Sequence, residues 1–300
     1  MSLSFIIFLS FFLFFGFFEP EILSSMKDSI PFLLGLVMFG MGCTIETKDL
    51  KNVFKNPKWV ITGLTLQYTV MPVTAFFLTK IFQLSEEITL GFIILGSCPG
   101  GTASNLIAYL SKANISLSVG LTICSTFLAA ILTPFWIFFL TKKQIDINFL
   151  SLVKTTFWIT IFPLIDGLIV RNLFKKKTKK FIKYLPKFSE LCIAIIIGII
   201  FSLTQDLISQ INIRFLLTII LHNLLGFLVG YQISKFLRFP KNVQKTISIE
   251  VGMQNSGLGL GLAMTYFSKL SLLPSAVFSL WHNISGLIMV HIWSKKNKFT

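Results

Sequence analysis

Charge is scarce in this sequence, and acidic charge is the scarcest. Charged residues make up 13% of the 300 residues, with 12 acidic side chains against 27 basic ones. Hydrophobic residues make up 54%, phenylalanine alone occurs 33 times, and the mean hydropathy is +0.78. So few polar residues cannot cover so much apolar surface in water. The composition therefore excludes an ordinary soluble domain and indicates an integral membrane protein.

Cysteine is also rare, and it follows no ligand or disulfide pattern. The four cysteines lie in or at the edges of apolar stretches, at Cys43, Cys98, Cys124 and Cys192. Without CxxC or Cys/His spacing, they are interpreted as small buried residues rather than as a disulfide or metal site. The apolar stretches also contain no paired aspartates, no HExxH and no Ser/His arrangement. An intramembrane enzyme with Glu250 and His282 as acid and base is therefore disfavoured, and we expect no enzymatic activity.

Alternating ten-residue barrel strands are absent too, so the membrane spans are expected to be helices. A helical span needs roughly 20 apolar residues. Ten stretches are candidates: 3–18, 29–45, 57–81, 87–111, 115–140, 148–173, 188–208, 213–237, 243–267 and 273–293. The first is short enough to resemble a signal peptide, but no Lys or Arg precedes Lys27 and no clear small-residue cleavage site follows. We interpret it as a tilted or partly interfacial first helix.

The basic residues are concentrated in alternate loops. With a cytoplasmic N-terminus, 20 cations lie in cytoplasmic segments and seven in external ones. By the positive-inside rule, this split supports ten spans with both termini in the cytoplasm, and the expected location is the plasma membrane. The predicted cytoplasmic loops are 46–58, 171–187 and 235–245, and the predicted external loops are 19–28, 82–87 and 204–212. The eight cations of 171–187 are interpreted as a topology signal beside anionic lipid, and no nucleic-acid partner is expected.

Two helix-breaking clusters interrupt the apolar stretches at corresponding places. "CPGGTASN" occupies residues 98–105, and "EVGMQNSGLGLG" occupies residues 250–261. Proline removes a backbone donor and paired glycines destabilise a helix interior, which lipid tolerates only where protein or a water-filled cavity covers the break. The alternative for Gly257, Gly259 and Gly261 is close packing between helices.

Each cluster lies in the fourth span of a five-span half, so the sequence predicts two repeats, residues 1–147 and 148–300. Because five is odd, the second repeat has inverted topology. Paired broken helices in inverted repeats point to a secondary transporter whose site lies near the bilayer midplane.

Glu250 is the most informative polar residue at a break. A carboxylate near the bilayer centre costs about 2.5 kcal/mol or more to insert, so it is normally paired, protonated or bound to an ion. Sodium, a hard cation, prefers oxygen ligands, which hydroxyls, amides, carboxylates and free carbonyls supply. Ser118 and Thr122 lie one turn apart on one helix face, and Gln67 adds an amide to an apolar span. The alternatives are a neutral Glu250 bonded to packing neighbours, and hydroxyls bonded back to their own helix.

Four segments together resemble the bile acid:sodium symporter family, especially its bacterial members. They are "FGMGCTIETKDLKNVFKNPK", "GSCPGGTASNLIAYLSKANISLSVGLT", "QKTISIEVGMQNSGLG" and "SLWHNISG", and the resemblance covers residues 30–294. It implies an all-α integral membrane protein with ten transmembrane helices in two inverted five-helix repeats. It also implies a core domain of helices 3–5 and 8–10, a panel domain of helices 1, 2, 6 and 7, and broken helices 4 and 9 that cross in the core.

The same resemblance implies two sodium sites and a substrate site. The first sodium site comprises Ser104, Asn105, Ser118, Thr122 and Glu250. The second comprises Gln67, Glu250 and Gln254 with the backbone carbonyls of Val251 and Met253. The residues that face substrate between core and panel are Thr102, Asn255, His282 and Asn283. His222 and His291 match no family site, and Asp166 departs from an expected apolar residue, either to pair with Arg171 or to line the cavity.

These observations predict a sodium-coupled symporter that imports an organic anion by alternating access. Its expected partners are sodium, the lipid bilayer and an anion such as a bile acid, pantoate or another small carboxylate. The alternative is a non-transporting membrane receptor or a channel for organic anions.

Overall fold

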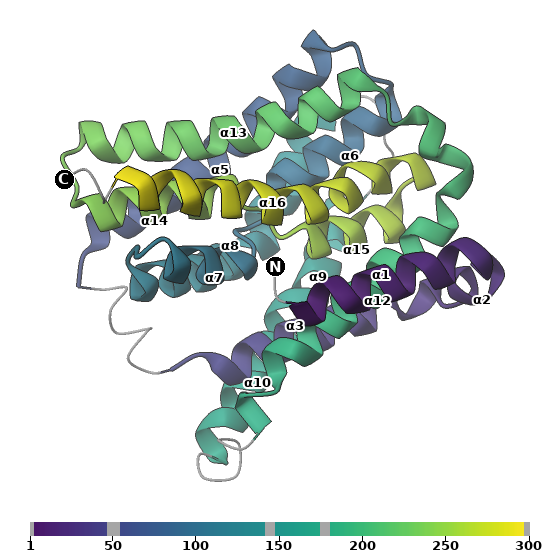
Figure 1. Ribbon diagram of the computed structural model, residues 1–300, viewed down its shortest axis with the longest axis horizontal. Coiled ribbons are helices and arrows are strands. Elements are labelled where there is room, and N and C mark those ends of the chain that lie inside the picture. The colour runs from purple at the N-terminus through teal and green to yellow at the C-terminus, as the bar shows by residue number, and fades with distance from the viewer. Residues whose placement is uncertain (1–2, 47–54, 142–147, 175–180, 297–300) are drawn as a thin grey trace.

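The computed structural model describes residues 3–46, 55–141, 148–174 and 181–296, and every regular element in these ranges is a helix (Figure 1). Six of the described helical stretches are long and apolar enough to cross a membrane. They are Pro57–Ile81 (α5), Ile115–Thr141 (α8), Phe149–Leu173, Leu185–Leu203 (α12), Ile213–Phe236 (α13) and Lys269–Ser294. A shorter apolar helix covers Ser4–Phe18. Over the described ranges, the structure therefore confirms an all-helical fold with helices of membrane-spanning length.

The remaining helices complete the apolar stretches predicted from the sequence. They are α1 (Leu3–Phe18), α2 (Pro20–Ser25), α3 (Ile30–Thr44), α6 (Glu86–Ser97), α7 (Ala103–Leu110), α9 (Phe149–Thr156), α10 (Phe162–Leu173), α14 (Lys241–Gly252), α15 (Ser256–Tyr266) and α16 (Leu273–Lys296). A π-helical turn, η2 (Phe157–Ile161), joins α9 to α10, and short 3₁₀ turns η1 (Lys27–Ser29), η3 (Gln205–Gln210) and η4 (Lys269–Leu272) connect other helices. The expected repeat boundary at residue 147 and the basic residues Lys48 and Lys51 lie outside the described ranges.

The two helix-breaking clusters interrupt helices as predicted, but over fewer residues. One interruption separates α6 from α7 at residues 98–102, and the other separates α14 from α15 at residues 253–255. Gly257, Gly259 and Gly261 are helical, within α15. A methyl group at Gly259 would come within 2.4 Å of the Ser275 hydroxyl oxygen. A methyl group at Gly257 or Gly261 would come within 2.9 Å or 2.6 Å of the Leu34 side chain. Close packing is thus the correct interpretation for these three glycines.

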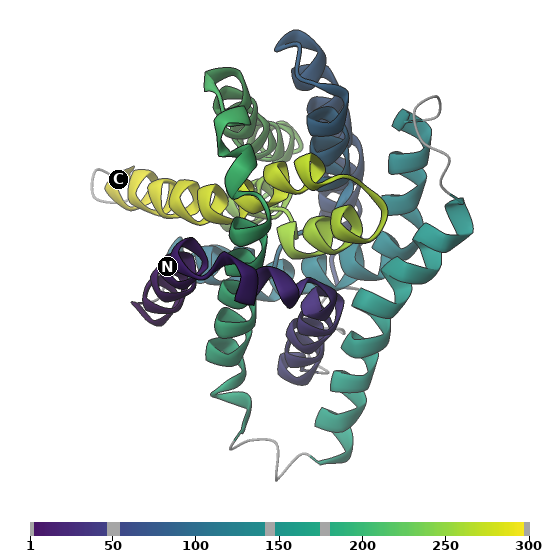
Figure 2. The ribbon, with the colours of Figure 1, turned by 90° about the vertical axis from the view of Figure 1, so that its right-hand side faces the viewer.

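The helices form two groups that pack internally and against each other. The four-helix layer consists of α1, α3, α12 and the continuous stretch α9–α10, and the crossing bundle consists of α5–α8 and α13–α16. After a quarter-turn, α9–α10 runs as a long teal helix along one side of the molecule (Figure 2). A buried apolar cluster joins the two groups and includes Leu34 and Ile159 from the layer and Ile94 and Leu262 from the bundle.

Two glycines allow a close approach of α3 and α10 within the four-helix layer. Gly42 of α3 and Gly167 of α10 face one another, and a methyl group on either would overlap a backbone carbonyl of the opposite helix, that of Leu164 or Phe39. Only glycine therefore permits this separation of α3 and α10, as is common where membrane helices pack.

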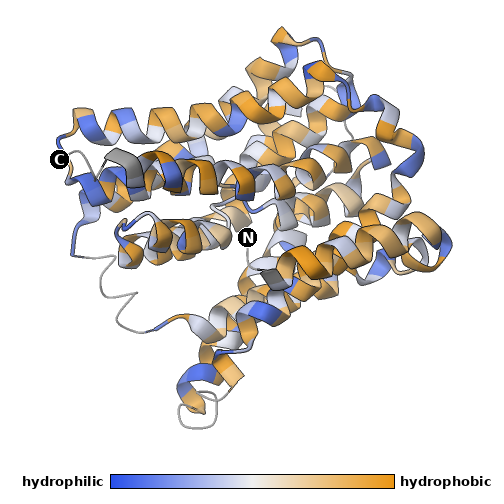
Figure 3. Cartoon of the chain, in the orientation of Figure 1, coloured by the Kyte–Doolittle hydropathy of each residue, from blue (hydrophilic) through white to orange (hydrophobic). Residues whose placement is uncertain are grey.

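Apolar residues predominate along the helices, and many of the most hydrophilic residues lie at helix ends and in the connecting segments (Figure 3). Phe14, Phe32, Ile131 and Trp158 each expose more than half of their surface. A lipid environment would remove this apolar area from water. All four cysteines are free, and Cys43, Cys98 and Cys192 are buried, which agrees with their interpretation as small apolar residues.

Candidate functional site

The two helix breaks meet at the centre of the crossing bundle. Gly100 and Gln254 form an antiparallel bridge. The Gly101 N–H donates to the Met253 carbonyl at 2.8 Å, and the Asn255 N–H donates to the Pro99 carbonyl at 2.8 Å. Each break therefore supplies hydrogen-bond partners for backbone groups of the other. Peptide groups freed at a helix break inside a membrane need such partners, because lipid offers none.

The neighbouring side chains explain why both interruptions are so short. The Asn255 side chain accepts from the Leu258 N–H at 3.1 Å and so caps the start of α15. The Gly100 N–H donates to the hydroxyl of Ser125 on α8 at 3.3 Å. Ser125 lies one further turn along the face that carries Ser118 and Thr122. It was not among the predicted site residues, although this helical spacing was visible in the sequence.

Glu250 lies at the end of α14, 4% exposed, among hydroxyl groups of α7 and α8. The Ser104 hydroxyl donates to its Oε1 at 2.5 Å, and the Thr122 hydroxyl donates to its Oε2 at 2.9 Å. The Ser118 hydroxyl contacts Oε1 as well and lies 2.9 Å from Oδ1 of Asn105. The structure therefore brings together all five residues that the sequence analysis assigns to the first sodium site.

This first cluster is rich in oxygen and poor in protons. A hydroxyl carries one proton, yet the Ser118 hydroxyl has both Glu250 and Asn105 within reach. The Thr122 hydroxyl similarly faces Glu250 and, at 3.0 Å, the Ser118 carbonyl. Thr122 thus has both acceptors from the sequence alternatives within reach, the site carboxylate and its own helix, and its one proton serves one of them at a time. Surplus oxygen around one carboxylate is the donor set that a hard monovalent cation prefers.

A second cluster surrounds the amide groups of Gln67 and Gln254. The Gln67 Nε2 donates to the Cys98 carbonyl at 3.0 Å. In the orientation of Gln254 that satisfies its amide, its oxygen accepts from Gln67 Nε2 at 3.0 Å and its nitrogen donates to the Cys98 carbonyl at 2.8 Å. The Gln254 amide in turn lies 3.4 Å from the Val251 carbonyl. The oxygen of Gln67 is buried without a hydrogen-bond partner among the described residues. An orphaned amide oxygen beside several carbonyls also fits a cation. The Met253 carbonyl, also predicted for this site, accepts from the Gly101 N–H at the crossing.

A cavity of about 610 Å³ lies beside the crossing point, between the four-helix layer and the crossing bundle. Its lining includes all four predicted substrate residues, Thr102, Asn255, His282 and Asn283. His282 is 5% exposed, and its Nδ1 has no hydrogen-bond partner among the described residues. The remaining lining is mostly apolar, as is usual for small-molecule sites, and it also includes Glu190 of α12, which the sequence analysis did not identify.

The other histidines and Asp166 lie elsewhere. His222 is fully buried against the Phe278 ring and contacts the Met71 carbonyl at 3.1 Å, while His291 is exposed. Asp166 is exposed on α10 and is not among the described residues that line the cavity.

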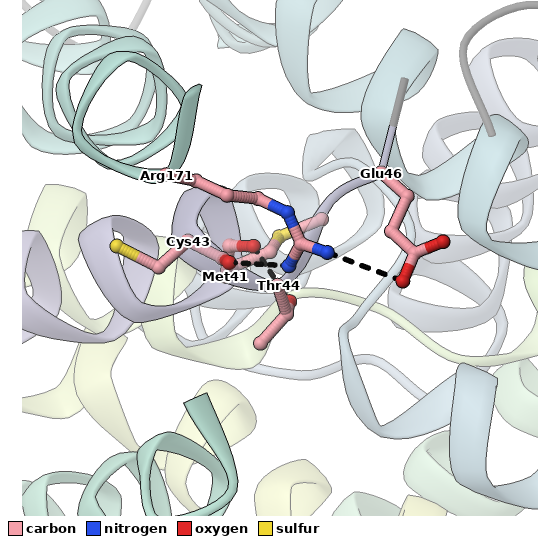
Figure 4. Close-up of polar contacts among 5 residues, drawn as sticks. All are labelled: Met41, Cys43, Thr44, Glu46 and Arg171. Atoms are coloured by element: carbon pink, nitrogen blue, oxygen red, sulfur yellow. Dashed lines mark hydrogen bonds and ion pairs between the residues drawn. The ribbon is translucent and has the colours of Figure 1, made fainter. Parts of the chain in front are cut away.

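Arg171 forms its ion pair with Glu46 and not with Asp166. It donates to the Cys43 carbonyl at 2.7 Å and pairs with Glu46 at 3.1 Å (Figure 4). Asp166 therefore neither pairs with Arg171 nor lines the cavity, and its side chain is exposed. Arg171 instead links α10 to the C-terminal end of α3. Its positive charge there interacts favourably with the negative end of the α3 helix dipole.

Comparisons with known proteins agree on one family. Residues 31–211 match the model of the sodium bile acid symporter family. The chain is 42% identical over 283 residues to an uncharacterized sodium-dependent transporter, YocS, of Bacillus subtilis strain 168, covering 94% of this chain and 88% of that protein.

Two more distant relatives come from eukaryotes. A probable sodium/metabolite cotransporter of Arabidopsis thaliana chloroplasts is 37% identical over 263 residues, which cover 87% of this chain and 66% of the relative. The human ileal sodium/bile acid cotransporter is 27% identical over 265 residues, which cover 87% of this chain and 76% of the relative.

Proposed function

The chain belongs to the sodium bile acid symporter family, and on that premise we propose that it imports an organic anion coupled to sodium by alternating access. The relatives are named as sodium-dependent transporters and cotransporters, so this is a transport family and not an enzyme family. The observation that carries the proposal is the buried carboxylate of Glu250 within a shell of hydroxyl and amide oxygens.

We assign the first sodium ion to Ser104, Asn105, Ser118, Thr122 and Glu250. The support is their convergence from three helices, α7, α8 and α14, on one buried carboxylate. Dipolar oxygens replace the hydration of the ion, and Glu250 supplies the compensating charge that a desolvated cation needs.

We assign the second sodium ion to Gln67, Glu250, Gln254 and the carbonyls of Val251 and Met253. The unpartnered oxygen of Gln67 and the adjacent carbonyls support this assignment. Glu250 contributes to both sites, so an ion at one site favours an ion at the other by holding the carboxylate ionised and fixed in place.

The substrate is an organic anion, such as a bile acid, pantoate or another small carboxylate, bound in the cavity beside the breaks. Thr102, Asn255, His282 and Asn283 line that cavity, and α7 and α15 begin there. The first turn of a helix offers unpaired N–H groups and a partial positive charge, both of which favour a carboxylate. Bound sodium adds to the same attraction, which links ion binding to substrate binding.

The fold supports an inverted-repeat architecture of ten helices, with repeats 1–147 and 148–300. The four-helix layer then corresponds to the panel domain and the crossing bundle to the core domain. The reciprocal bonds between residues 99–101 and 253–255 support this assignment, because each break donates one backbone hydrogen bond to the other and accepts one from it.

The cavity indicates the conformational state. It extends from the breaks to the end of α3 at Thr44 and the start of α12 at Leu185, which the loop charges assign to the cytoplasmic side. Toward the opposite end, the Tyr266 hydroxyl bonds to Thr155 at 2.5 Å and to the Ser151 carbonyl at 2.9 Å, joining bundle to layer. We therefore interpret this structure as an inward-facing state in the plasma membrane, with both termini cytoplasmic.

Uptake into liposomes containing the purified protein tests this function. An inward sodium gradient should drive accumulation of at least one carboxylate from a panel of bile acids, pantoate and 2-oxo acids, and sodium on both sides should not. Flux that ignores the sodium gradient would identify a channel instead. Saturable binding without flux would identify a receptor.

A further inference from the structure

Ser125 of α8 is hydrogen-bonded to two other elements through different atoms. Its hydroxyl accepts from the Gly100 N–H of the first break at 3.3 Å and donates to the Thr122 carbonyl of its own helix at 3.1 Å. Its backbone carbonyl accepts from the Tyr68 hydroxyl of α5 at 2.5 Å. Ser125 therefore joins the first break, α8 and α5 at one buried position, although the proposed sodium and substrate sites do not include it.

The Ser125 hydroxyl makes both of its bonds at once. It has one proton to donate and lone pairs with which to accept, so the bond to Thr122 does not compete with the bond from Gly100. Thr126 provides a comparison in the same turn of α8, because its buried hydroxyl donates to the same Thr122 carbonyl at 2.7 Å. Among the described residues, the Thr126 hydroxyl has no bond to the break. The bond to Gly100 is thus what separates Ser125 from an ordinary back-bonded helix hydroxyl.

Thr102, which lines the cavity, lies between two attachments of the first break to α8. Before it in the chain, Gly100 is bonded to Ser125. After it, the Ser104 hydroxyl lies 3.5 Å from the Thr122 hydroxyl. Ser104 and Thr122 are proposed sodium ligands, whereas Gly100 and Ser125 are not. Removing the Ser125 hydroxyl would therefore free one side of Thr102 and leave the proposed sodium ligands in place.

Gly100 also lies close to the carboxylate of the first sodium site. A methyl group at Gly100 would lie 3.1 Å from Glu250 Oε2 and 3.6 Å from the Ser125 hydroxyl oxygen. Both oxygens therefore face the same side of the Gly100 backbone. The chain continues from Gly100 directly to Gly101 and Thr102 at the cavity.

We propose that Ser125 is a positioning residue through which sodium at the first site fixes the first break and so strengthens substrate binding. Sodium holds the Thr122 turn of α8, and the Ser125 hydroxyl carries that constraint to Gly100 and the cavity. By linkage, substrate at the break strengthens sodium binding by the same factor. This inference rests on the proposed function and adds to it a residue that couples the two ligands without contacting either.

The test measures hydrogen–deuterium exchange of the backbone amides of residues 96–105 in the purified protein, with sodium and with potassium at equal ionic strength. In wild type, sodium should slow exchange in this segment. In Ser125→Ala, sodium should still raise the thermal unfolding temperature, but its effect on exchange should fall by roughly twofold to tenfold, the equilibrium effect of one hydrogen bond. In liposomes, the same variant should raise the KM for the transported carboxylate at saturating sodium.

Two further variants separate positioning from packing. Thr126→Val deletes a buried hydroxyl of the same turn and should keep the wild-type effect of sodium on exchange. Ser125→Cys keeps a side chain of similar shape with a weaker donor and acceptor, so it should lie between wild type and Ser125→Ala. A role in packing alone would not produce this order.

The outcomes for Ser125 and for transport are distinct. The role of Ser125 would be overturned by equal sodium effects on exchange in wild type and Ser125→Ala, or by no such effect in a wild type that sodium stabilises. Equal losses in Ser125→Ala and Thr126→Val, or failure of both Ser125 variants to fold, would also overturn it, because each indicates a structural role alone. Absence of sodium stabilisation and of sodium-driven uptake in wild type would instead refute the proposed function.

Discussion

Gly101 and Gln254 touch through their backbones although they belong to different helix breaks. A methyl group at Gly101 would lie 2.6 Å from the Gln254 carbonyl oxygen and 3.0 Å from its carbon, so the crossing leaves no space for a side chain. The bridge between the breaks thus depends on the absence of one atom at Gly101, and Gln254, a proposed ion ligand, is part of that bridge.

Gly101→Ala should therefore destabilise the protein and abolish sodium-driven uptake. Overpacking of this kind typically costs about 1–3 kcal/mol, and the backbone shift would also displace the Gln254 amide. Gly35→Ala is the matched control, because nothing lies within 4 Å of the added methyl group. Thermal unfolding in detergent and uptake in liposomes measure both effects, and equal behaviour of the two variants would show that the crossing tolerates a side chain.

Glu250→Gln should lower sodium affinity more than tenfold, or by more than about 1.4 kcal/mol. The substitution keeps the size and one carbonyl oxygen but deletes the charge that compensates a desolvated cation. Folding should persist, because the neutral residue is easier to insert into a membrane span. Gln67→Ala should lower sodium affinity less, since it removes one neutral ligand of the second site alone.

Sodium-dependent thermal shift on both variants measures these affinities, with lithium and potassium as ion controls. Wild-type sodium stabilisation together with wild-type uptake in Glu250→Gln would mean that the carboxylate is a packing residue. The coupling mechanism would then need a different charge.

The positions of the breaks were predictable because proline and paired glycine disfavour a helix wherever they occur. Pro99, Gly100 and Gly101 mark the first interruption. Local rules also explain the one clear shift of a helix boundary: α12 begins at Leu185 rather than residue 188, because proline is tolerated in the first helical turn. It ends at Leu203 because residues 205–210 tighten into a 3₁₀ turn.

Partner choice was less predictable, because it depends on distances between helices that one sequence does not contain. Arg171 lies five residues after Asp166, yet it bonds to Cys43 and Glu46 at the end of α3, which the Gly42–Gly167 contact brings close. Tertiary packing also places Ser125 at the first break and Glu190 at the cavity. Their residue types alone are ordinary for membrane helices.

Thr102→Leu should abolish substrate uptake while stabilisation by sodium persists. Thr102 lines the cavity at the start of α7, and its side chain makes no capping hydrogen bond to that helix. A bulkier apolar side chain would occupy substrate space and leave the Glu250 oxygens in place. Thr69→Leu, on an exposed face of α5, is the control for added apolar bulk. Unchanged uptake in Thr102→Leu would mean that the substrate binds elsewhere.

Tyr266 provides the last prediction, because its hydroxyl joins the crossing bundle to the four-helix layer. It bonds to the Thr155 hydroxyl at 2.5 Å and to the Ser151 carbonyl at 2.9 Å, away from the end of the cavity that we propose to be cytoplasmic. In alternating access, these bonds must break whenever the layer and the bundle separate on the external side. Tyr266→Phe deletes the hydroxyl and keeps the ring. A hydrogen bond contributes about 0.5–1.5 kcal/mol net, so the loss of two should shift the equilibrium toward the outward-facing state by roughly tenfold.

A cysteine introduced at Ser189 on the cavity wall reports this shift. It should react with a membrane-impermeant maleimide from the cytoplasmic side, and the reaction should slow in Tyr266→Phe because the inward-facing state is less populated. Thr155→Val removes one of the two bonds and should produce a smaller change of the same sign. Equal reaction rates in all three backgrounds would show that Tyr266 does not hold the external side closed.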